Sequence, residues 1–132
     1  MEDTGSATIL LVEDDALLRQ AFRLLLEDAG YRCREAGSAA ETLRLIDEEI
    51  PSLVLLDLGL PDLPGLELTR RLREDARTAD IPVVALTGRA GEHERRACLE
   101  AGCTHYFAKP LSPNELLRWL PELLAGRDMS ST

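Results

Sequence analysis

The chain has 132 residues, of which 45% are apolar, 30% are charged and 4% are aromatic. This length corresponds to one domain, which can close a hydrophobic core without disulfide bonds or a structural metal. Acidic residues outnumber basic residues 24 to 15, and the resulting net charge of −9 disfavours direct binding to nucleic acid or to anionic lipid.

The first predicted elements are a strand, a helix and an edge strand. Thr8–Val12 is continuously apolar, which is typical of a strand that is buried on both faces of a sheet. Asp15 can cap the helix that follows, and Gly30 ends it. Tyr31–Ala36 alternates and carries charge, which favours a strand at the sheet edge, and Ser38 begins the second helix.

The rest of the chain repeats this alternation of strand and helix. Apolar runs predict two further buried strands and a shorter mixed one, and Pro, Gly or Ser residues mark the helix that follows each. These strands are Ser52–Leu56, Ile81–Leu86 and Thr104–Ala108, and the helix starts are Pro64 or Gly65, Gly91 and Ser112. Five strand-helix units predict an α/β domain over residues 8–126, between tails at 1–7 and 127–132, with a parallel sheet covered on both faces.

The sequence also indicates the compartment. Its N-terminus has no signal-peptide pattern, and no apolar run reaches membrane-spanning length. The three cysteines, Cys33, Cys98 and Cys103, lack C-x-x-C spacing, which argues against a disulfide framework or a zinc site. We therefore expect a soluble, cytoplasmic protein that does not bind membranes.

Polar residues follow four of the five predicted strands. Glu13 and Asp14 come after the first strand, Asp57 after the third, Thr87 after the fourth and Lys109 after the fifth. The carboxyl ends of parallel strands share one rim of an open α/β sheet, where ligands bind. Oxygen ligands without histidine or thiolate favour Mg²⁺, and such a cation would relieve the repulsion among the acids. The hydroxyl and the ammonium group complete a set that predicts phosphoryl transfer to Asp57 as the nucleophile.

Each of these residues also has a structural interpretation when it is taken alone. An Asp after a strand is commonly a turn residue, the acidic run Glu13-Asp14-Asp15 can cap a helix, and Thr87 can do the same. Lys109 is different, because it is the only lysine in a chain with fourteen arginines. A compact ammonium group fits a phosphoryl pocket in a way that a planar guanidinium does not, so this lysine favours the functional interpretation.

Four segments resemble the receiver domain of two-component response regulators. They are LLVEDD, LVLLDLGLPDLPGLEL, VVALTGRA and HYFAKP, and the resemblance extends from Thr8 to Ala125. It implies a flavodoxin-like, doubly wound fold with strand order 2-1-3-4-5. It also implies that Asp57 accepts a phosphoryl group from a histidine kinase or a phosphotransfer protein and becomes an aspartyl phosphate. The output protein or output domain, and the choice between a monomer and a phosphorylation-dependent dimer, stay open.

The same resemblance implies the ligands of the Mg²⁺ ion. Asp14 is the direct carboxylate ligand of the acidic pair, and Glu13 acts through water. Asp57 and the backbone carbonyl of Gly59 complete the protein ligands.

The resemblance also implies which residues contact the phosphoryl group and which change conformation when it is bound. Lys109 pairs with the phosphoryl group, and the peptide bond between Lys109 and Pro110 is cis. Thr87 moves toward the phosphoryl oxygen, and Tyr106 turns inward into the space that Thr87 leaves. This movement alters the surface of the fourth helix and fifth strand and so controls partner binding.

The expected activity is self-catalysed phosphoryl transfer and autodephosphorylation, and the chain is a phosphoacceptor rather than an enzyme. Without the motion, Tyr106 is an ordinary edge aromatic.

Two other functions use related residues. A haloacid-dehalogenase-like phosphatase also has an aspartyl nucleophile at a strand end, but it places a second Asp two residues later, where this chain has Gly59. The alternative that stays open is a receiver-like module that binds proteins without phosphorylation.

The predicted fifth helix departs from the expected pattern. Pro121 lies inside the predicted fifth helix, where it removes a backbone donor, so we expect a kink or a break there. Such an interruption would affect any dimer built on a straight fifth helix.

Overall fold

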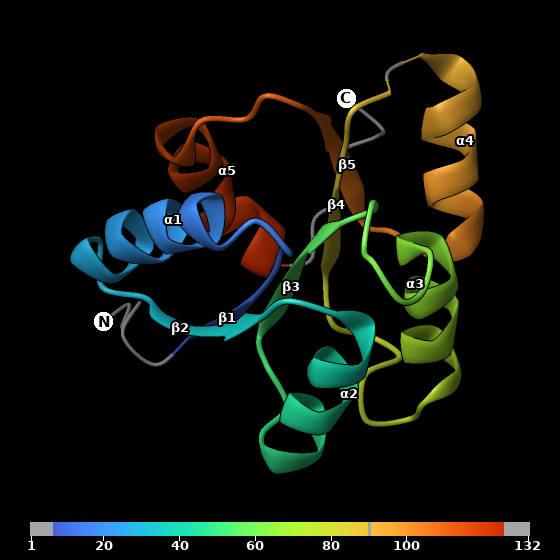
Figure 1. Cartoon of the computed structure of the whole chain (residues 1–132), viewed down its shortest axis with the longest axis horizontal. Coiled ribbons are helices and arrows are strands. Elements are labelled where there is room, and N and C mark those ends of the chain that lie inside the picture. The colour runs from blue at the N-terminus through green and yellow to red at the C-terminus, as the bar shows by residue number, and fades with distance from the viewer. Residues whose placement is uncertain (1–6, 90, 126–132) are drawn as a thin grey trace.

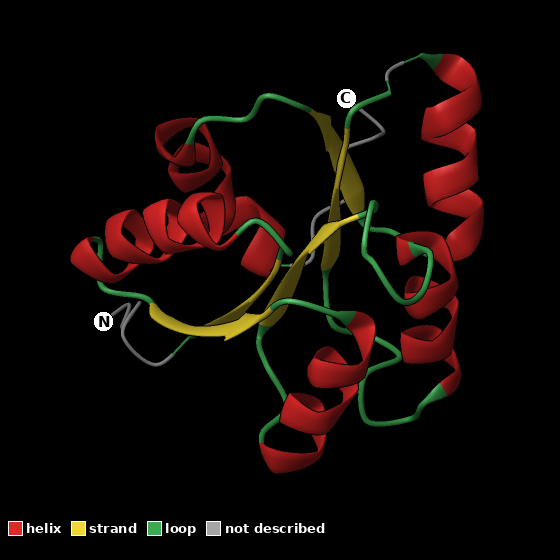
Figure 2. Cartoon of the chain, in the orientation of Figure 1, coloured by secondary structure: helices red, strands yellow, loops and turns green. Residues whose placement is uncertain are grey.

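The fold comes from a computed structural model, which describes residues 7–89 and 91–125. In this part of the chain, five strands alternate with five helices (Figures 1 and 2). The strands are β1 (Thr8–Val12), β2 (Arg32–Ala36), β3 (Leu53–Asp57), β4 (Val83–Thr87) and β5 (His105–Ala108). The helices are α1 (Ala16–Asp28), α2 (Ala39–Glu48), α3 (Gly65–Glu74), α4 (Glu92–Ala101) and α5 (Pro113–Leu124). Residues 1–6 and 126–132, which hold most of the predicted tails and the expected last residue of the domain, lie outside the described residues.

The strands of the described chain form one parallel sheet in the order β2-β1-β3-β4-β5. This confirms the predicted fold class and strand order, including the edge position of β2. The central strands β1, β3 and β4 are buried at every residue. Four predicted strands begin one or two residues early, and the third and fourth also end one residue early. Asp57 and Thr87 are therefore the last residues of β3 and β4 rather than loop residues, and Asp57 pairs in register with Leu86.

The helices divide between the two faces of the sheet. Helices α1 and α5 cover one face, and α2, α3 and α4 cover the other, as Figure 1 shows. Each face has its own hydrophobic core, because the side chains of a buried strand alternate between the two sides. Buried leucine, isoleucine and phenylalanine side chains of the helices fill these cores; they include Phe22, Leu26, Leu116 and Leu120 on one face and Ile46, Leu68 and Leu72 on the other.

Side-chain caps fix the loops at the carboxyl edge of the sheet. Asp15 accepts hydrogen bonds from the N–H groups of Leu17 and Leu18, as the prediction of a cap requires. The second helix is also capped as predicted, since the hydroxyl of Ser38 accepts from the N–H of Glu41. Because these caps satisfy backbone groups that would otherwise be free, the loops that follow β1 and β2 are held in place.

The predicted interruption at Pro121 is not a break, since α5 continues through this residue to Leu124, and a kink there stays a prediction. Proline removes one hydrogen bond of the helix, but Leu120 and Leu123 on either side are fully buried against the sheet. Their packing holds the last turn in place.

Within residues 7–89 and 91–125, every helix is too short or too polar to cross a bilayer.

Candidate functional site

A cleft of about 870 Å³ opens at the carboxyl edge of the sheet. All four predicted strand ends contribute to its lining, with Glu13, Asp14, Asp57, Thr87 and Lys109 among the residues. Strands that are not neighbours in sequence thus meet at one rim, because a parallel sheet places all its carboxyl ends on the same side. The structure brings the predicted residues together, and the cleft lies where the sequence predicts it.

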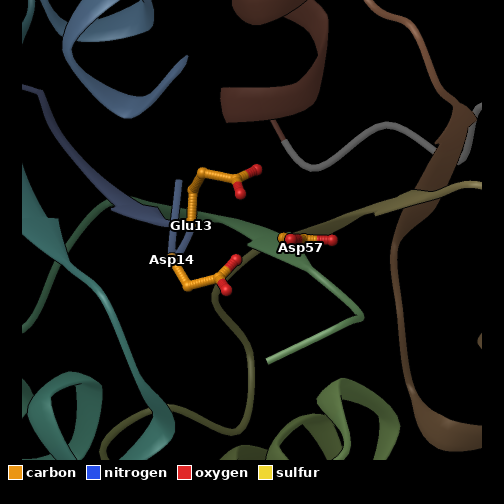
Figure 3. A group of neighbouring side chains, drawn as sticks. All are labelled: Glu13, Asp14 and Asp57. Carbon is orange, nitrogen blue, oxygen red and sulfur yellow. The ribbon is translucent and has the colours of Figure 1, made fainter. Parts of the chain in front are cut away.

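Three carboxylates converge in this cleft. Figure 3 shows the side chains of Glu13, Asp14 and Asp57 turned toward a common space, the first two from the end of β1 and the third from β3. One oxygen of each lies within 4.8 Å of the others. Glu13 and Asp57 are buried, at 7% and 4% exposure, whereas Asp14 is exposed. Two acids that are shielded from water therefore face each other beside an open one.

The two carboxylate oxygens of Glu13 differ in their surroundings. Oε2 accepts a hydrogen bond from the backbone N–H of Asp15 at 3.1 Å. Oε1 is buried, has no hydrogen-bond partner among the described residues, and lies 4.0 Å from the Nζ atom of Lys109. Burial, with a further contribution from the negative charge of Asp57, raises the pKa of Glu13 to about 7, although the Asp15 N–H and Lys109 act in the opposite direction.

These observations fit a divalent cation. A buried carboxylate oxygen without a hydrogen-bond partner is costly unless something positive lies beside it. The ligands on offer are all oxygen atoms, which Mg²⁺ prefers. Gly59 also lines the cleft, and its backbone N–H donates to Oδ1 of Asp57 at 3.2 Å, which holds the start of the β3–α3 loop against this carboxylate.

Lys109 lies directly opposite the acids. Its Nζ atom is 3.0 Å from Oδ1 of Asp57. Burial lowers the pKa of Lys109, but the hydrogen bond and the negative charges of Asp57 and Glu13 outweigh burial, so the net shift is upward and the ammonium group stays charged. The peptide bond from Lys109 to Pro110 is cis, as expected, and the Lys109 N–H donates to the carbonyl of Thr87 at 2.7 Å.

Thr87 is buried, and its hydroxyl is engaged in two hydrogen bonds. The oxygen accepts from the backbone N–H of Arg89 at 3.1 Å. The hydroxyl donates to Oε2 of Glu94, in the first turn of α4, at 3.4 Å. Glu94 also lines the cleft. Sequence reasoning did not select this residue, although its place in the first turn of the helix after Thr87 was a usable signal.

Tyr106, the second predicted switch residue, lies on β5 and is half-buried. It packs against the core on the face that α2, α3 and α4 cover, the same core that contains Cys98 of α4. The structure thus places Tyr106 beside α4, while its predicted motion stays a prediction.

Two further residues brace the loops that carry the acids, and sequence reasoning missed both. The guanidinium group of Arg19 donates to the backbone carbonyl of Glu13 at 2.6 Å and is paired with Glu35. The carboxylate of Asp62 in the β3–α3 loop accepts from the N–H groups of Ala39 and Ala40 at the start of α2. These backbone hydrogen bonds lower the pKa of Asp62. An arginine among fourteen and one of many acids offered no sequence signal for these contacts.

Comparison with known proteins gives one consistent family. A family model described as the response regulator receiver domain matches residues 9–120. Over 117 residues, the chain is 42% identical to the phosphate regulon transcriptional regulatory protein PhoB of Pseudomonas aeruginosa, an alignment that covers 89% of this chain and 51% of PhoB. The chain therefore spans about half the length of this curated relative.

Solved structures show the same architecture. The chemotaxis response regulator CheY4 of Vibrio cholerae aligns with a TM-score of 0.84 at 26% identity, and covers 89% of this chain and 98% of its own. The receiver domain of sensor histidine kinase PA1611 from Pseudomonas aeruginosa aligns with a TM-score of 0.81 at 32% identity, over 90% of this chain and 98% of that domain. In that structure a magnesium ion is coordinated in the active-site cleft.

Proposed function

Since this chain belongs to the family of response regulator receiver domains, we propose that it is a phosphorylation-dependent signalling switch. Receiver domains interact with histidine kinases or phosphotransfer proteins, and their role is signalling rather than metabolic catalysis. The individual steps of this function rest on the geometry of the cleft at the carboxyl edge of the sheet.

Asp57 is the proposed phosphoacceptor. One of its carboxylate oxygens attacks the phosphorus of a phosphohistidine on the kinase or phosphotransfer protein. A P–O bond forms while the P–N bond breaks, the imidazole nitrogen keeps the electron pair and gains a proton, and Asp57 becomes an aspartyl phosphate. Attack of water on the same phosphorus later restores the carboxylate and releases phosphate. The burial of Asp57 at the end of β3 supports this role, because a fixed nucleophile needs little reorganisation.

Lys109 and Thr87 are the proposed partners of the phosphoryl oxygens. The ammonium group of Lys109, at 3.0 Å from Asp57, would move its contact to a phosphoryl oxygen and offset the added negative charge. Thr87 would donate a hydrogen bond from its hydroxyl group to a second phosphoryl oxygen. Thr87 ends β4, which lies next to β3, and Lys109 follows β5, the next strand out, which supports their reach toward Asp57.

The carboxylates of Glu13, Asp14 and Asp57, with the backbone carbonyl of Gly59, are the proposed ligands of Mg²⁺, Glu13 acting through water. When bound, the ion supplies positive charge that stabilises the phosphoryl oxygens during transfer. The unpartnered Oε1 of Glu13 and the spacing of the three carboxylates support this assignment.

The proposed output is a changed surface on α4 and β5. Thr87 turns toward the phosphoryl group, and Tyr106 turns inward and takes the space that Thr87 leaves. The packing of Tyr106 in the same core as α4 supports a link between the cleft and this surface. The output protein or output domain would recognise the altered surface, either with a monomer or through a phosphorylation-dependent dimer of this chain.

We place this switch in the cytoplasm. All three cysteines are free thiols, and Cys98 and Cys103 are both buried in the core. Free thiols are typical of proteins in a reducing compartment.

The observation that carries the proposal is the contact between Lys109 and the buried carboxylate of Asp57 beside two further acids. Incubation with acetyl phosphate and Mg²⁺, followed by intact-mass measurement, should show a protein carrying one phosphate. The Asp57→Asn variant and a sample treated with EDTA should show none. Asp75→Asn removes a carboxylate away from the cleft and should behave like the parent. If the parent forms no adduct, the alternative of a module that binds proteins without phosphorylation holds.

A further inference from the structure

The hydroxyl proton of Thr87 is already committed to Glu94. A threonine hydroxyl has one proton and donates one hydrogen bond, while its oxygen can accept others. Here the oxygen accepts from the N–H of Arg89, and the proton points to Oε2 of Glu94. A phosphoryl oxygen accepts hydrogen bonds only, so it needs the same proton. The contacts of Thr87 with Glu94 and with a phosphoryl group therefore exclude each other.

Glu94 also connects this hydroxyl to a helix. It lies in the first turn of α4, and Thr87 is the last residue of β4, so their hydrogen bond joins the strand end to the helix. The nearby arginines Arg95 and Arg96 pair with a different acid, Glu92. The carboxylate of Glu94 is thus oriented toward the cleft, which it lines, rather than toward these cations.

We propose that Glu94 is a positioning residue that holds the Thr87 hydroxyl away from the phosphoryl site in the unphosphorylated protein. When Thr87 turns to the phosphoryl group, its bond to Glu94 breaks, and the first turn of α4 loses this tie to the sheet. This inference rests on the proposed function, and it adds the element through which α4 detects the state of Thr87. It also means that Glu94 lowers the fraction of protein that is ready to accept a phosphoryl group.

The first test compares rates of phosphorylation by acetyl phosphate in the presence of Mg²⁺. Glu94→Ala should raise the rate constant about three- to tenfold, because it removes the hydrogen bond that holds the Thr87 hydroxyl. This factor is the one expected for a hydrogen bond to a charged, partly exposed acceptor. Glu100→Ala is the matched control, because it removes the same charge from the exposed C-terminal part of α4. The control should react at the rate of the parent. Equal rates for Glu94→Ala and Glu100→Ala would contradict the proposal.

A double-mutant cycle separates the hydrogen bond from the charge of Glu94. In the Thr87→Ala background there is no hydroxyl to release, so Glu94→Ala should leave the rate unchanged. The cycle is measured at high ionic strength, where salt screens the direct effect of a nearby negative charge. An equal acceleration with and without the hydroxyl would show that Glu94 acts through its charge alone, and the proposal would be wrong.

Amide NMR spectra give a readout that does not depend on phosphoryl transfer. With Mg²⁺ alone, the Thr87 and α4 resonances of Glu94→Ala should shift part of the way toward those of the parent saturated with Mg²⁺ and beryllofluoride, a phosphoryl mimic. Unchanged resonances would contradict the inference. The proposed function fails in a different way, since it requires that the parent itself form an adduct on Asp57.

Discussion

At the scale of single residues, the three carboxylates of the cleft carry the same charge but have different surroundings. Glu13 has lost most of its water, Asp14 has kept it, and Asp57 is compensated by the ammonium group of Lys109. The same lysine therefore has two effects. It stabilises the acids when no other cation is present, and it opposes a second cation that binds to them.

This double effect predicts opposite changes in two measurements for Lys109→Ala. Without the ammonium group, the Mg²⁺ affinity should increase about three- to tenfold, because a repulsive charge at close range is removed. Phosphorylation by acetyl phosphate should become slower by a factor of ten or more, on the order expected for loss of a charge that stabilises the transition state. Calorimetric titration with Mg²⁺ and intact-mass kinetics measure the two quantities.

The control for Lys109→Ala is Arg118→Ala, which changes the net charge equally on the exposed side of α5. It should alter both quantities little. Weaker Mg²⁺ binding in Lys109→Ala than in this control would contradict the assigned position of the lysine among the acids.

At the scale of elements, the carboxyl and amino ends of the strands differ in the side chains that surround them. The carboxyl edge carries the acids, while the amino edge is held together by Arg73 of α3. Its guanidinium group donates to the carbonyls of Gly102, Thr78, Ala79 and Ile81. One side chain thus ties α3 to the loops that precede β4 and β5. Gly102 has a positive φ of 111°, and a Cβ there would lie 2.6 Å from Cγ of Arg73, so the arginine also requires this glycine.

Arg73→Ala should therefore destabilise the fold without removing any cleft residue. Partly buried carbonyls would lose their donor, and we expect a loss of about 2–4 kcal/mol in the free energy of unfolding. Urea unfolding followed by the fluorescence of Trp119 measures the loss. Arg71→Ala, an exposed neighbour that pairs with Glu67, should unfold near the parent midpoint. A similar midpoint for Arg73→Ala and Arg71→Ala would show that the network is not needed.

The elements and the strand-end residues were predictable from the sequence, and the contacts between distant side chains were not. The short apolar runs, which alternate with helical patterns, place Asp57, Thr87 and Lys109 at strand ends. The parallel topology then brings these residues to one rim. Glu94, Arg19 and Asp62 act through hydrogen bonds whose partners depend on side-chain orientation and on loop paths. The break considered at Pro121 does not occur for a related reason: the local cost of a proline is visible in sequence, whereas the packing of Leu120 and Leu123 that outweighs it is a property of the fold.

At the scale of the whole molecule, the net charge of −9 makes the fold sensitive to cations in two ways. Any salt weakens the general repulsion between surface acids. A divalent ion bound by Glu13, Asp14 and Asp57 would add a second, specific stabilisation, because the unfolded chain does not assemble this site. The two effects can be separated at equal ionic strength.

Mg²⁺ should raise the melting temperature above that in NaCl of the same ionic strength. At about ten times the dissociation constant, linkage gives about 1.4 kcal/mol, which corresponds to a shift of roughly 3–5 °C for a domain of this size. Asp57→Asn should melt at a higher temperature than the parent without Mg²⁺, because one of three crowded carboxylates is gone, and it should respond less to the ion. Thermal unfolding followed by circular dichroism measures both variants. An equal response of the parent and Asp57→Asn would place the ion elsewhere on the acidic surface, since only a site that includes Asp57 links the removal of this charge to the loss of the specific increment.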